Sequence, residues 1–293
     1  MKKIKKIKVL ITGASGLLGS VLTNVLEKYD LYAFTKEQFD VTNFNNSKLK
    51  LQKINPDVII HTAALTDLDY CELNPQISNV VNVLSTQNLV EYCYKTNCKM
   101  IYISSTGVYG NKYLNKNYKE NDYIQPTTIH HKHKYESEIL IKNKLKNFLV
   151  LRTGWLYGGS IHHKKNFVIK RYFEAKNKKI IYSDNSQYGN PTYALNFAKQ
   201  IKLLLEKNIS GTFNCVDHAK NVTRHYYVQE IIKNFDLNCQ VKIGKKEIFK
   251  RAAPVSCNES ALNNNLNKIN LDIMKEWKLS LKGYIENIKK QMK

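Results

Sequence analysis

The sequence is poor in cysteine, and its cysteines form no disulfide or zinc-binding framework. The six residues include no CxxC pair: Cys71, Cys93, Cys98, Cys215, Cys239 and Cys257. This spacing favours reduced thiols over a disulfide framework or a zinc site. The chain also lacks any apolar run near the roughly 18 residues of a membrane span. Too few apolar residues follow the basic start, MKKIKKIK, for a signal peptide, so we expect a cytoplasmic protein without membrane contact.

Acidic residues are scarce relative to basic ones: 24 oppose 46, which gives a net charge of +22. The arginines are few, and lysines are spread through every segment. The arginines are Arg152, Arg171, Arg224 and Arg251. Proteins that read nucleic acid concentrate arginine at base contacts, so no nucleic-acid partner is expected. A basic surface does favour anionic small molecules such as nucleotide sugars.

Residues 8–20, KVLITGASGLLGS, combine a short apolar strand, a glycine-rich turn and the start of a helix. Glycines at three-residue spacing in this context are typical of a dinucleotide-binding turn, where backbone N–H groups and a helix N-terminus meet the pyrophosphate. The cofactor contacts expected here are Gly13, Ser15, Gly16, Leu17 and Leu18.

Further strands and helices alternate along the chain. Strands are expected at 31–34, 58–61, 100–104, 148–152 and 212–216, and helices at 45–53, 76–97, 129–144 and 193–206. We therefore predict an α/β protein, a Rossmann-type doubly wound parallel sheet with a smaller C-terminal α/β substrate-binding lobe. Residues 1–155 are assigned to the NAD(P)-binding domain. Residues 156–293 are assigned mainly to the lobe, with a segment at about 185–215 returning to the first domain.

The ends of the predicted strands carry the other expected cofactor contacts. Thr35 and Lys36 follow the second strand, where folds that prefer NAD usually carry an acidic residue. A lysine there favours NADPH, and NADH is left open. The remaining contacts expected from this edge are Asp40, Val41, Ala63, Ala64 and Thr66. Residues 189–192 are expected to form a turn, and the tail from 271 to 292 is expected to be helical.

Several motifs together resemble one family. They are TGASGLLG (12–19), PDVIIHTAALTDLDYCELNP (56–75), ISSTGVYG (103–110), LRTGWLYG (151–158) and QYGNPT (187–192). The chain resembles extended short-chain dehydrogenase/reductases, and within them the dTDP-4-dehydrorhamnose reductase group. This resemblance implies hydride transfer from a nicotinamide cofactor to the 4-keto carbon of a nucleotide-linked 6-deoxy sugar, in the synthesis of a surface polysaccharide precursor. It also implies catalysis by a hydroxyl residue, a tyrosine and a lysine.

Carried over by motif, the hydroxyl residue is Ser105 and the lysine is Lys134, which would also hold the cofactor ribose. The tyrosine position is occupied by His130. Three hypotheses stay open. His130 acts as general acid; or catalysis is lost and the chain is a non-catalytic nucleotide-binding or regulatory subunit, as in methionine adenosyltransferase; or another donor, such as Tyr109, Tyr135 or water, supplies the proton.

The resemblance also implies the substrate side of the site. The expected substrate contacts are Ser105, Thr106, Trp155, Asn166 and Gln187. The family's closing Arg-Pro pair is replaced by Cys257-Asn258, with Arg251 nearby. No metal site is expected, because His130 and His133 lie at i, i+3 without a second ligand cluster. A nucleotide sugar is the expected partner, and a homodimer is left open.

Overall fold

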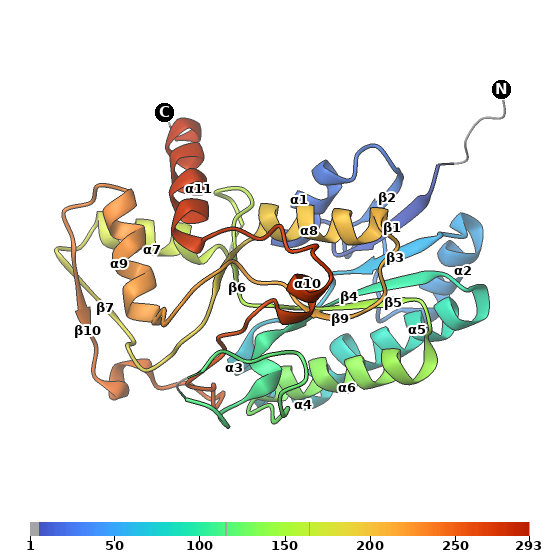
Figure 1. Cartoon of the computed structure of the whole chain (residues 1–293), viewed down its shortest axis with the longest axis horizontal. Coiled ribbons are helices and arrows are strands. Elements are labelled where there is room, and N and C mark those ends of the chain that lie inside the picture. The colour runs from blue at the N-terminus through green and yellow to red at the C-terminus, as the bar shows by residue number, and fades with distance from the viewer. Residues whose placement is uncertain (1–5, 115, 164, 293) are drawn as a thin grey trace.

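A parallel six-stranded sheet forms the centre of the molecule in the computed structural model, which describes residues 6–114, 116–163 and 165–292 (Figure 1). Its strand order is β2-β1-β3-β4-β5-β9. The strands are β1 (Lys8–Thr12), β2 (Asp30–Phe34), β3 (Val58–His61), β4 (Lys99–Ser105), β5 (Phe148–Thr153) and β9 (Gly211–Asn214). Every neighbouring pair is parallel. The predicted Rossmann-type fold is therefore confirmed.

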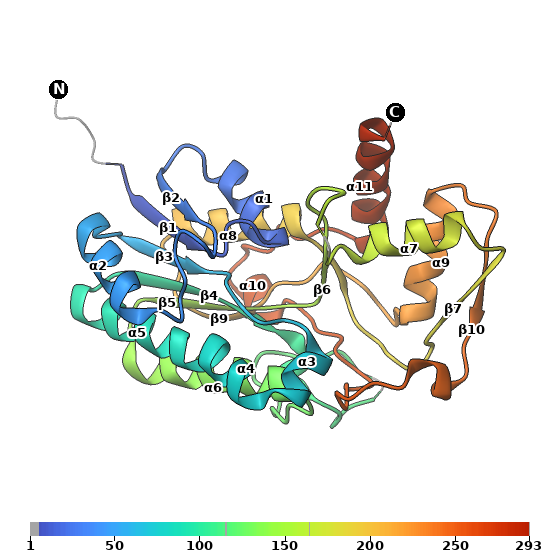
Figure 2. The same ribbon diagram turned by 180° about the vertical axis from the view of Figure 1, so that it is seen from behind.

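Helices cover both faces of this sheet (Figures 1 and 2). On one face lie α1 (Leu17–Val25) and α8 (Ala194–Glu206), and on the other lie α2 (Phe44–Ile54), α5 (Ser85–Thr96) and α6 (Ile129–Lys144). Alternate strand residues point to opposite faces: Val9 and Ile11 join the core under α1, whereas Leu10 joins the core under α5. Burial on both faces explains the unbroken apolar runs inside β1, β3, β4 and β5.

The region predicted as one helix at 76–97 is divided in the structure. It contains α4 (Pro75–Asn79), a π-helical turn (Val80–Leu84) and α5. The π turn holds Asn82, whose side chain accepts from Leu65 N at 2.9 Å and donates to Leu65 O at 3.0 Å. Closing both bonds fixes the loop that follows β3, which also contains α3 (Leu68–Leu73), a helix the sequence did not indicate.

A second buried cluster lies in a smaller lobe beside the sheet. Its elements are α7 (Phe167–Lys176), β7 (Ile180–Ser183), α9 (Arg224–Asn234), β10 (Gln240–Ile243) and α11 (Trp277–Gln291). The strands β7 and β10 pair in parallel. The chain passes back from this lobe to the sheet through β8 (Pro191–Tyr193), α8 and β9. The boundary predicted at residue 155 stays a prediction.

Three local predictions were wrong. Residues 191–193 form β8, which pairs with β6 (Trp155–Tyr157), rather than ending a turn. The tail becomes helical only at Trp277, after the short helix α10 (Asn264–Lys268) and a connecting segment. The last sheet strand spans Gly211–Asn214 and stops two residues earlier than predicted. Within the described ranges, no helix has the length and apolar character that a membrane crossing requires.

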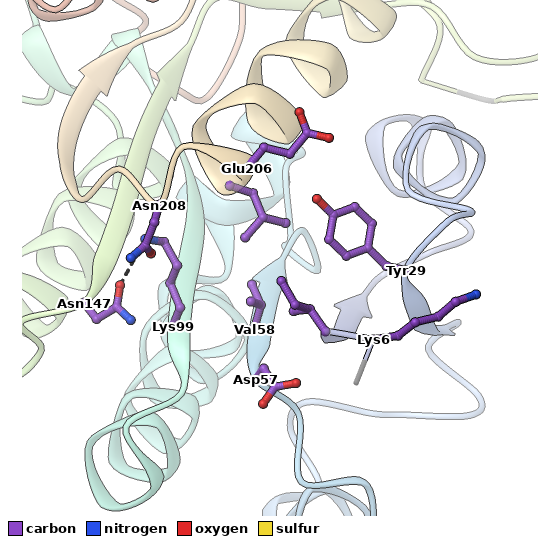
Figure 3. A pocket seen from close by; sticks show the side chains of 10 residues that line it. Lys6, Tyr29, Asp57, Val58, Lys99, Asn147, Glu206 and Asn208 are labelled. Atoms are coloured by element: carbon purple, nitrogen blue, oxygen red, sulfur yellow. Dashed lines mark hydrogen bonds between the residues drawn. The ribbon is translucent and has the colours of Figure 1, made fainter. Parts of the chain in front are cut away.

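A cavity of about 600 Å³ opens at the amino ends of the sheet strands, opposite the edge that carries the glycine turn (Figure 3). Lys99 lies at its wall, and only 3% of this residue is exposed. Its Nζ donates to Asn147 Oδ1, Asn208 Oδ1 and Ile209 O, at 3.0, 3.2 and 2.7 Å. Burial lowers the pKa of Lys99. The lysine thus ties the starts of β4, β5 and β9 together.

Replacing Lys99 with methionine keeps the chain length but leaves these acceptors without their donor. We expect a loss of about 1–3 kcal/mol in the free energy of unfolding, since buried polar groups without partners carry a desolvation penalty of that size. Urea unfolding measures it. Lys95→Met, at an exposed lysine near the end of α5, is the control and should change little. Equal free energies of unfolding for Lys99→Met and Lys95→Met would contradict the structural role of Lys99.

Candidate functional site

The glycine turn between β1 and α1 packs so closely against its neighbours that two of its glycines leave no space for a side chain. Gly13 has φ +70°, and a Cβ on it would lie 2.8 Å from the backbone N and Cα of Ala63. A Cβ on Gly19 would lie 2.3 Å from Gly13 O. Ser15 and Gly16 are exposed at the N-terminus of α1. The N–H groups of the first turn, including Leu17 and Leu18, have no intrahelical acceptors, so the turn suits a diphosphate.

The end of β2 carries the predicted ribose-side contacts. Lys36 is exposed just beyond the strand, next to Thr35. The Asp40 carboxylate accepts from Thr42 N at 2.9 Å and from Thr42 Oγ1 at 2.7 Å, and Val41 is buried. These bonds, led by the Thr42 hydroxyl, lower the pKa of Asp40. The Asp40 side chain is therefore used to close a turn, and cofactor contact by these four residues stays a prediction.

The end of β3 meets both the glycine turn and the lobe. Ala63 packs against Gly13, and Ala64 follows it. Two residues further on, Thr66 Oγ1 accepts from Lys165 Nζ at 2.6 Å. Lys165 precedes α7, so this bond joins the lobe to the dinucleotide-binding side. The predicted cofactor residues at the ends of β1 and β3 are thus brought together at one edge of the sheet.

The predicted hydroxyl residue and lysine meet at the carboxyl end of β4. Ser105 is the last residue of that strand, and its Oγ accepts from Gly107 N at 3.1 Å. Lys134, on α6, donates from Nζ to Ile103 O at 2.9 Å. Burial lowers the pKa of Lys134 to about 8, against the opposing effect of Glu138. An ammonium held at Ile103, two residues before Ser105, can donate to a hydroxyl or carbonyl oxygen of a bound ligand.

His130 also reaches this region but is held by a backbone carbonyl. Its Nδ1 lies 2.9 Å from Leu65 O. A carbonyl can only accept, so Nδ1 carries the proton, and Nε2 of the neutral ring carries none. Burial, His131 and Lys134 hold the pKa of His130 well below 6.5. The neutral ring presents an acceptor rather than a donor at Nε2, which disfavours His130 as the general acid.

Of the two tyrosines named as other donors, Tyr109 lies in the protein interior and Tyr135 is half-buried. The Tyr109 hydroxyl accepts from Arg152 Nη1 at 2.9 Å and donates to Asn214 Oδ1 at 2.8 Å. Tyr109 is fully buried, and its hydroxyl proton is used in the hydrogen bond to Asn214. Tyr135 is half-buried and packs against the cluster that contains Tyr109.

A buried carboxylate on α6 holds both β5 and β4, the strand that carries Ser105. Arg152, on β5, donates from Nε and Nη2 to the two oxygens of Glu138, at 2.9 and 2.6 Å. Ser104 Oγ donates to the same carboxylate at 2.7 Å. The exposed fractions of the Arg152 and Glu138 side chains are 1% and 0%. Burial raises the pKa of Glu138, but Arg152 lowers it more, so the carboxylate stays ionised. The sequence offered only one signal, an arginine inside an apolar strand.

The lobe contributes an aromatic and charged group that the sequence indicated only in part. Trp155 Nε1 donates to Glu259 Oε2 at 3.1 Å, and the Arg224 guanidinium lies 3.4 Å from the centre of the Trp155 ring. The backbone N of Arg224 donates to Gln187 O at 2.9 Å. Burial lowers the pKa of Arg224 to about 10, against the opposing effect of Glu259. The predicted residues Trp155 and Gln187 are therefore neighbours, joined by an arginine that sequence reasoning missed.

Two predicted substrate contacts lie inside the protein. Asn166 is fully buried at the N-cap of α7, where its amide donates to Gly158 O at 2.9 Å and to Tyr284 Oη at 2.5 Å. Thr106 is also fully buried. Both side chains lie inside the protein, and substrate contact by Asn166 and Thr106 stays a prediction.

These features define a Rossmann-type α/β protein with a glycine turn, a serine and a lysine at one sheet edge. The family model described as the RmlD substrate binding domain matches residues 7–290, and the chain belongs to this family. A dTDP-4-dehydrorhamnose reductase of Aggregatibacter actinomycetemcomitans is 33% identical over 207 residues, 70% of this chain and 69% of that protein.

Two solved structures are similar over nearly the whole chain. A dTDP-4-dehydrorhamnose reductase of Clostridium acetobutylicum has a TM-score of 0.90 at 26% identity, covering 97% of this chain and 100% of that one. The dTDP-4-dehydrorhamnose reductase of Bacillus anthracis, in complex with NADP, has a TM-score of 0.90 at 27% identity. That likeness covers 96% of this chain and 99% of the other.

Proposed function

We propose that this protein uses NADPH to reduce the 4-keto group of a nucleotide-linked 6-deoxy sugar, in cytoplasmic synthesis of a surface polysaccharide precursor. One observation supports the proposal: Ser105 ends β4 and the Lys134 ammonium binds Ile103 O of the same strand, on the sheet edge that also carries the glycine turn. The relatives named as dTDP-4-dehydrorhamnose reductases support the same activity.

The chain's own residues have separable tasks in this reaction. The turn at Gly13 and Gly16, with the N-terminus of α1, would hold the dinucleotide diphosphate. When bound, the cofactor supplies the hydride. Lys134 would donate hydrogen bonds from its buried Nζ to the nicotinamide ribose, and Ser105 Oγ–H would orient the ketone oxygen.

Lys36 is proposed to favour NADPH through the charge of its ammonium. Lys36→Glu should weaken NADPH binding about tenfold or more, because one charge-assisted hydrogen bond contributes about 1.5 kcal/mol or more. NADH binding should stay the same or improve. Fluorescence titration with both cofactors measures the ratio of dissociation constants. Lys48→Glu, at an exposed lysine on α2, makes the same charge change away from the strand end. An unchanged ratio in Lys36→Glu would contradict the assignment.

Arg224 is proposed to replace the positive charge lost with the family's Arg-Pro pair. Its guanidinium has no hydrogen-bond acceptor among the described residues and lies against Trp155 at the substrate side. Arg224→Gln should raise the KM for the nucleotide sugar about tenfold, with a smaller change in kcat, because guanidinium–phosphate bonds are charge-assisted. Initial rates measure both constants. An unchanged KM would place the substrate's phosphates elsewhere.

The direct test is incubation with NADPH and a panel of nucleotide 4-keto sugars, followed at the nicotinamide absorbance. Consumption of NADPH with one of them supports the reductase. Tight NADPH binding without turnover on any of them favours the non-catalytic nucleotide-binding subunit, for which the position of His130 is the favouring observation. Light scattering on the same sample decides between a monomer and a homodimer.

A further inference from the structure

One imidazole in the site is held differently from its buried neighbours. His61, His130 and His133 each have Nδ1 within hydrogen-bond distance of an oxygen, at Thr12 (2.8 Å), Leu65 (2.9 Å) and Ser78 (2.8 Å). His131 instead has its Nε2 3.4 Å from Ser105 Oγ. Its Nδ1 is buried and has no hydrogen-bond partner among the described residues. Only 4% of His131 is exposed.

The position of the His131 ring depends on a glycine. A Cβ on Gly107 would lie 2.1, 2.3 and 2.5 Å from Cε1, Nε2 and Nδ1 of His131. The ring therefore lies directly against the Gly107 backbone, in space that any side chain at 107 would fill. The same turn donates Gly107 N–H to Ser105 Oγ, so serine, glycine and imidazole form one packed unit. Thr128 fixes the other end by accepting from His131 N at 3.2 Å.

We propose that His131, acting through Ser105, supplies the proton for the reduction. This inference rests on the proposed function. As hydride forms the new C–H bond at the sugar's carbonyl carbon, the C=O electron pair moves to oxygen, which takes the Ser105 hydroxyl proton. Ser105 Oγ takes the Nε2 proton of imidazolium His131, which becomes neutral imidazole. The cofactor is oxidised and the ketone is reduced to an alcohol, so atoms and charges balance.

The surroundings of His131 predict how this step depends on pH. Burial lowers the pKa of His131; Glu259 opposes this and Lys134 adds to it. The His130 ring packs edge-on at 5.2 Å and is neutral. Imidazolium is therefore favoured at acidic pH, and kcat/KM should fall with one proton's dependence as pH rises towards the ordinary imidazole range near 6.5. The pKa of Lys134 is about 8, so loss of its charge should lower kcat/KM a second time at higher pH.

Four variants test the proposal with dTDP-4-dehydrorhamnose and NADPH. His131→Gln keeps an N–H donor near Ser105 but cannot release a proton. It should lose about 100-fold or more in kcat/KM at acidic pH, the usual contribution of general acid catalysis, and should lose the lower pH dependence. His131→Phe should show the same loss of kcat/KM and of the lower pH dependence. Gly107→Ala, which keeps the histidine but displaces its ring, should show a similar loss. His130→Gln tests the rival donor, and the lower pH dependence should remain in it, because the His130 ring is neutral and held by Leu65 O.

A second readout does not depend on turnover. Imidazole ¹⁵N spectra, with His131 assigned by its absence in His131→Gln, should show His130 protonated on Nδ1 and His131 protonated on Nε2. A His131→Gln enzyme with the wild-type rate and pH profile overturns this inference while the reductase stands. So does a His130→Gln enzyme that alone loses the profile. Wild-type protein that binds NADPH but reduces no 4-keto sugar overturns the proposed function, and this inference with it.

Discussion

Replacing Arg152 with methionine is expected to lower the free energy of unfolding by about 3–5 kcal/mol, because it leaves the buried Glu138 carboxylate without its main partner. Both side chains are almost fully buried, and Arg152 also donates to Tyr109. The half-buried Lys142 keeps its contact with Glu138, but its ammonium is partly in solvent. Chemical denaturation measures the loss. Arg171→Met, which removes a partly exposed pair with Glu174, is the control and should cost no more than about 1 kcal/mol.

The free energy of unfolding lost in Arg152→Met should become smaller at low pH. In the wild-type protein the pKa of Glu138 is held below its ordinary value, because Arg152 outweighs the raising effect of burial. That pair therefore adds stability above the unfolded pKa of about 4.3, and the contribution is lost as pH falls through the folded pKa. In Arg152→Met burial dominates and raises this pKa, so protonation relieves the penalty as pH falls. An Arg152→Met deficit that grows towards acid would contradict this assignment.

Gly13→Val is expected to weaken NADPH binding about 100-fold or more. Valine is strained at φ +70°, and its Cβ would lie 2.8 Å from backbone atoms of Ala63, which cannot rotate away. The turn must shift, and the amide groups that face the diphosphate shift with it; about 2.7 kcal/mol corresponds to this change. Calorimetric titration measures the dissociation constant. Gly283→Val, on an exposed face of α11 with open space around it, is the control. Equal affinity in both variants would place the cofactor elsewhere.

Local pattern was enough to predict the sheet and the glycine turn. Most sheet strands contain a short apolar run, and Gly13 and Gly16 lie between β1 and α1, with Gly19 in the first turn of α1. By contrast, β6 and β8 are three residues each and pair across more than thirty positions, so neither has a local signal. The π turn at 80–84 arises from the contact of Asn82 with Leu65, which periodicity does not reveal.

The sequence could predict the site residues that belong to motifs, but it could not predict those whose position depends on side-chain packing. Ser105 and Lys134 follow from motif position, and the structure brings them to one strand end. Which of three neighbouring histidines faces Ser105 depends on how α6 is rotated against β4, and the space at Gly107 decides that. Arg224 reaches Trp155 from a segment almost seventy residues away, so the pair is visible only after folding.

The most direct test of the proposed reaction is transfer of label from the cofactor to the sugar. NADPH carrying deuterium in its transferable position is incubated with dTDP-4-dehydrorhamnose and the wild-type protein, and the product is examined by NMR. A reductase predicts deuterium bonded to the former carbonyl carbon of the sugar, at the rate at which NADPH is consumed. Saturable NADPH binding with the ketone recovered unlabelled would contradict the proposal and leave a nucleotide-binding protein that performs no reduction.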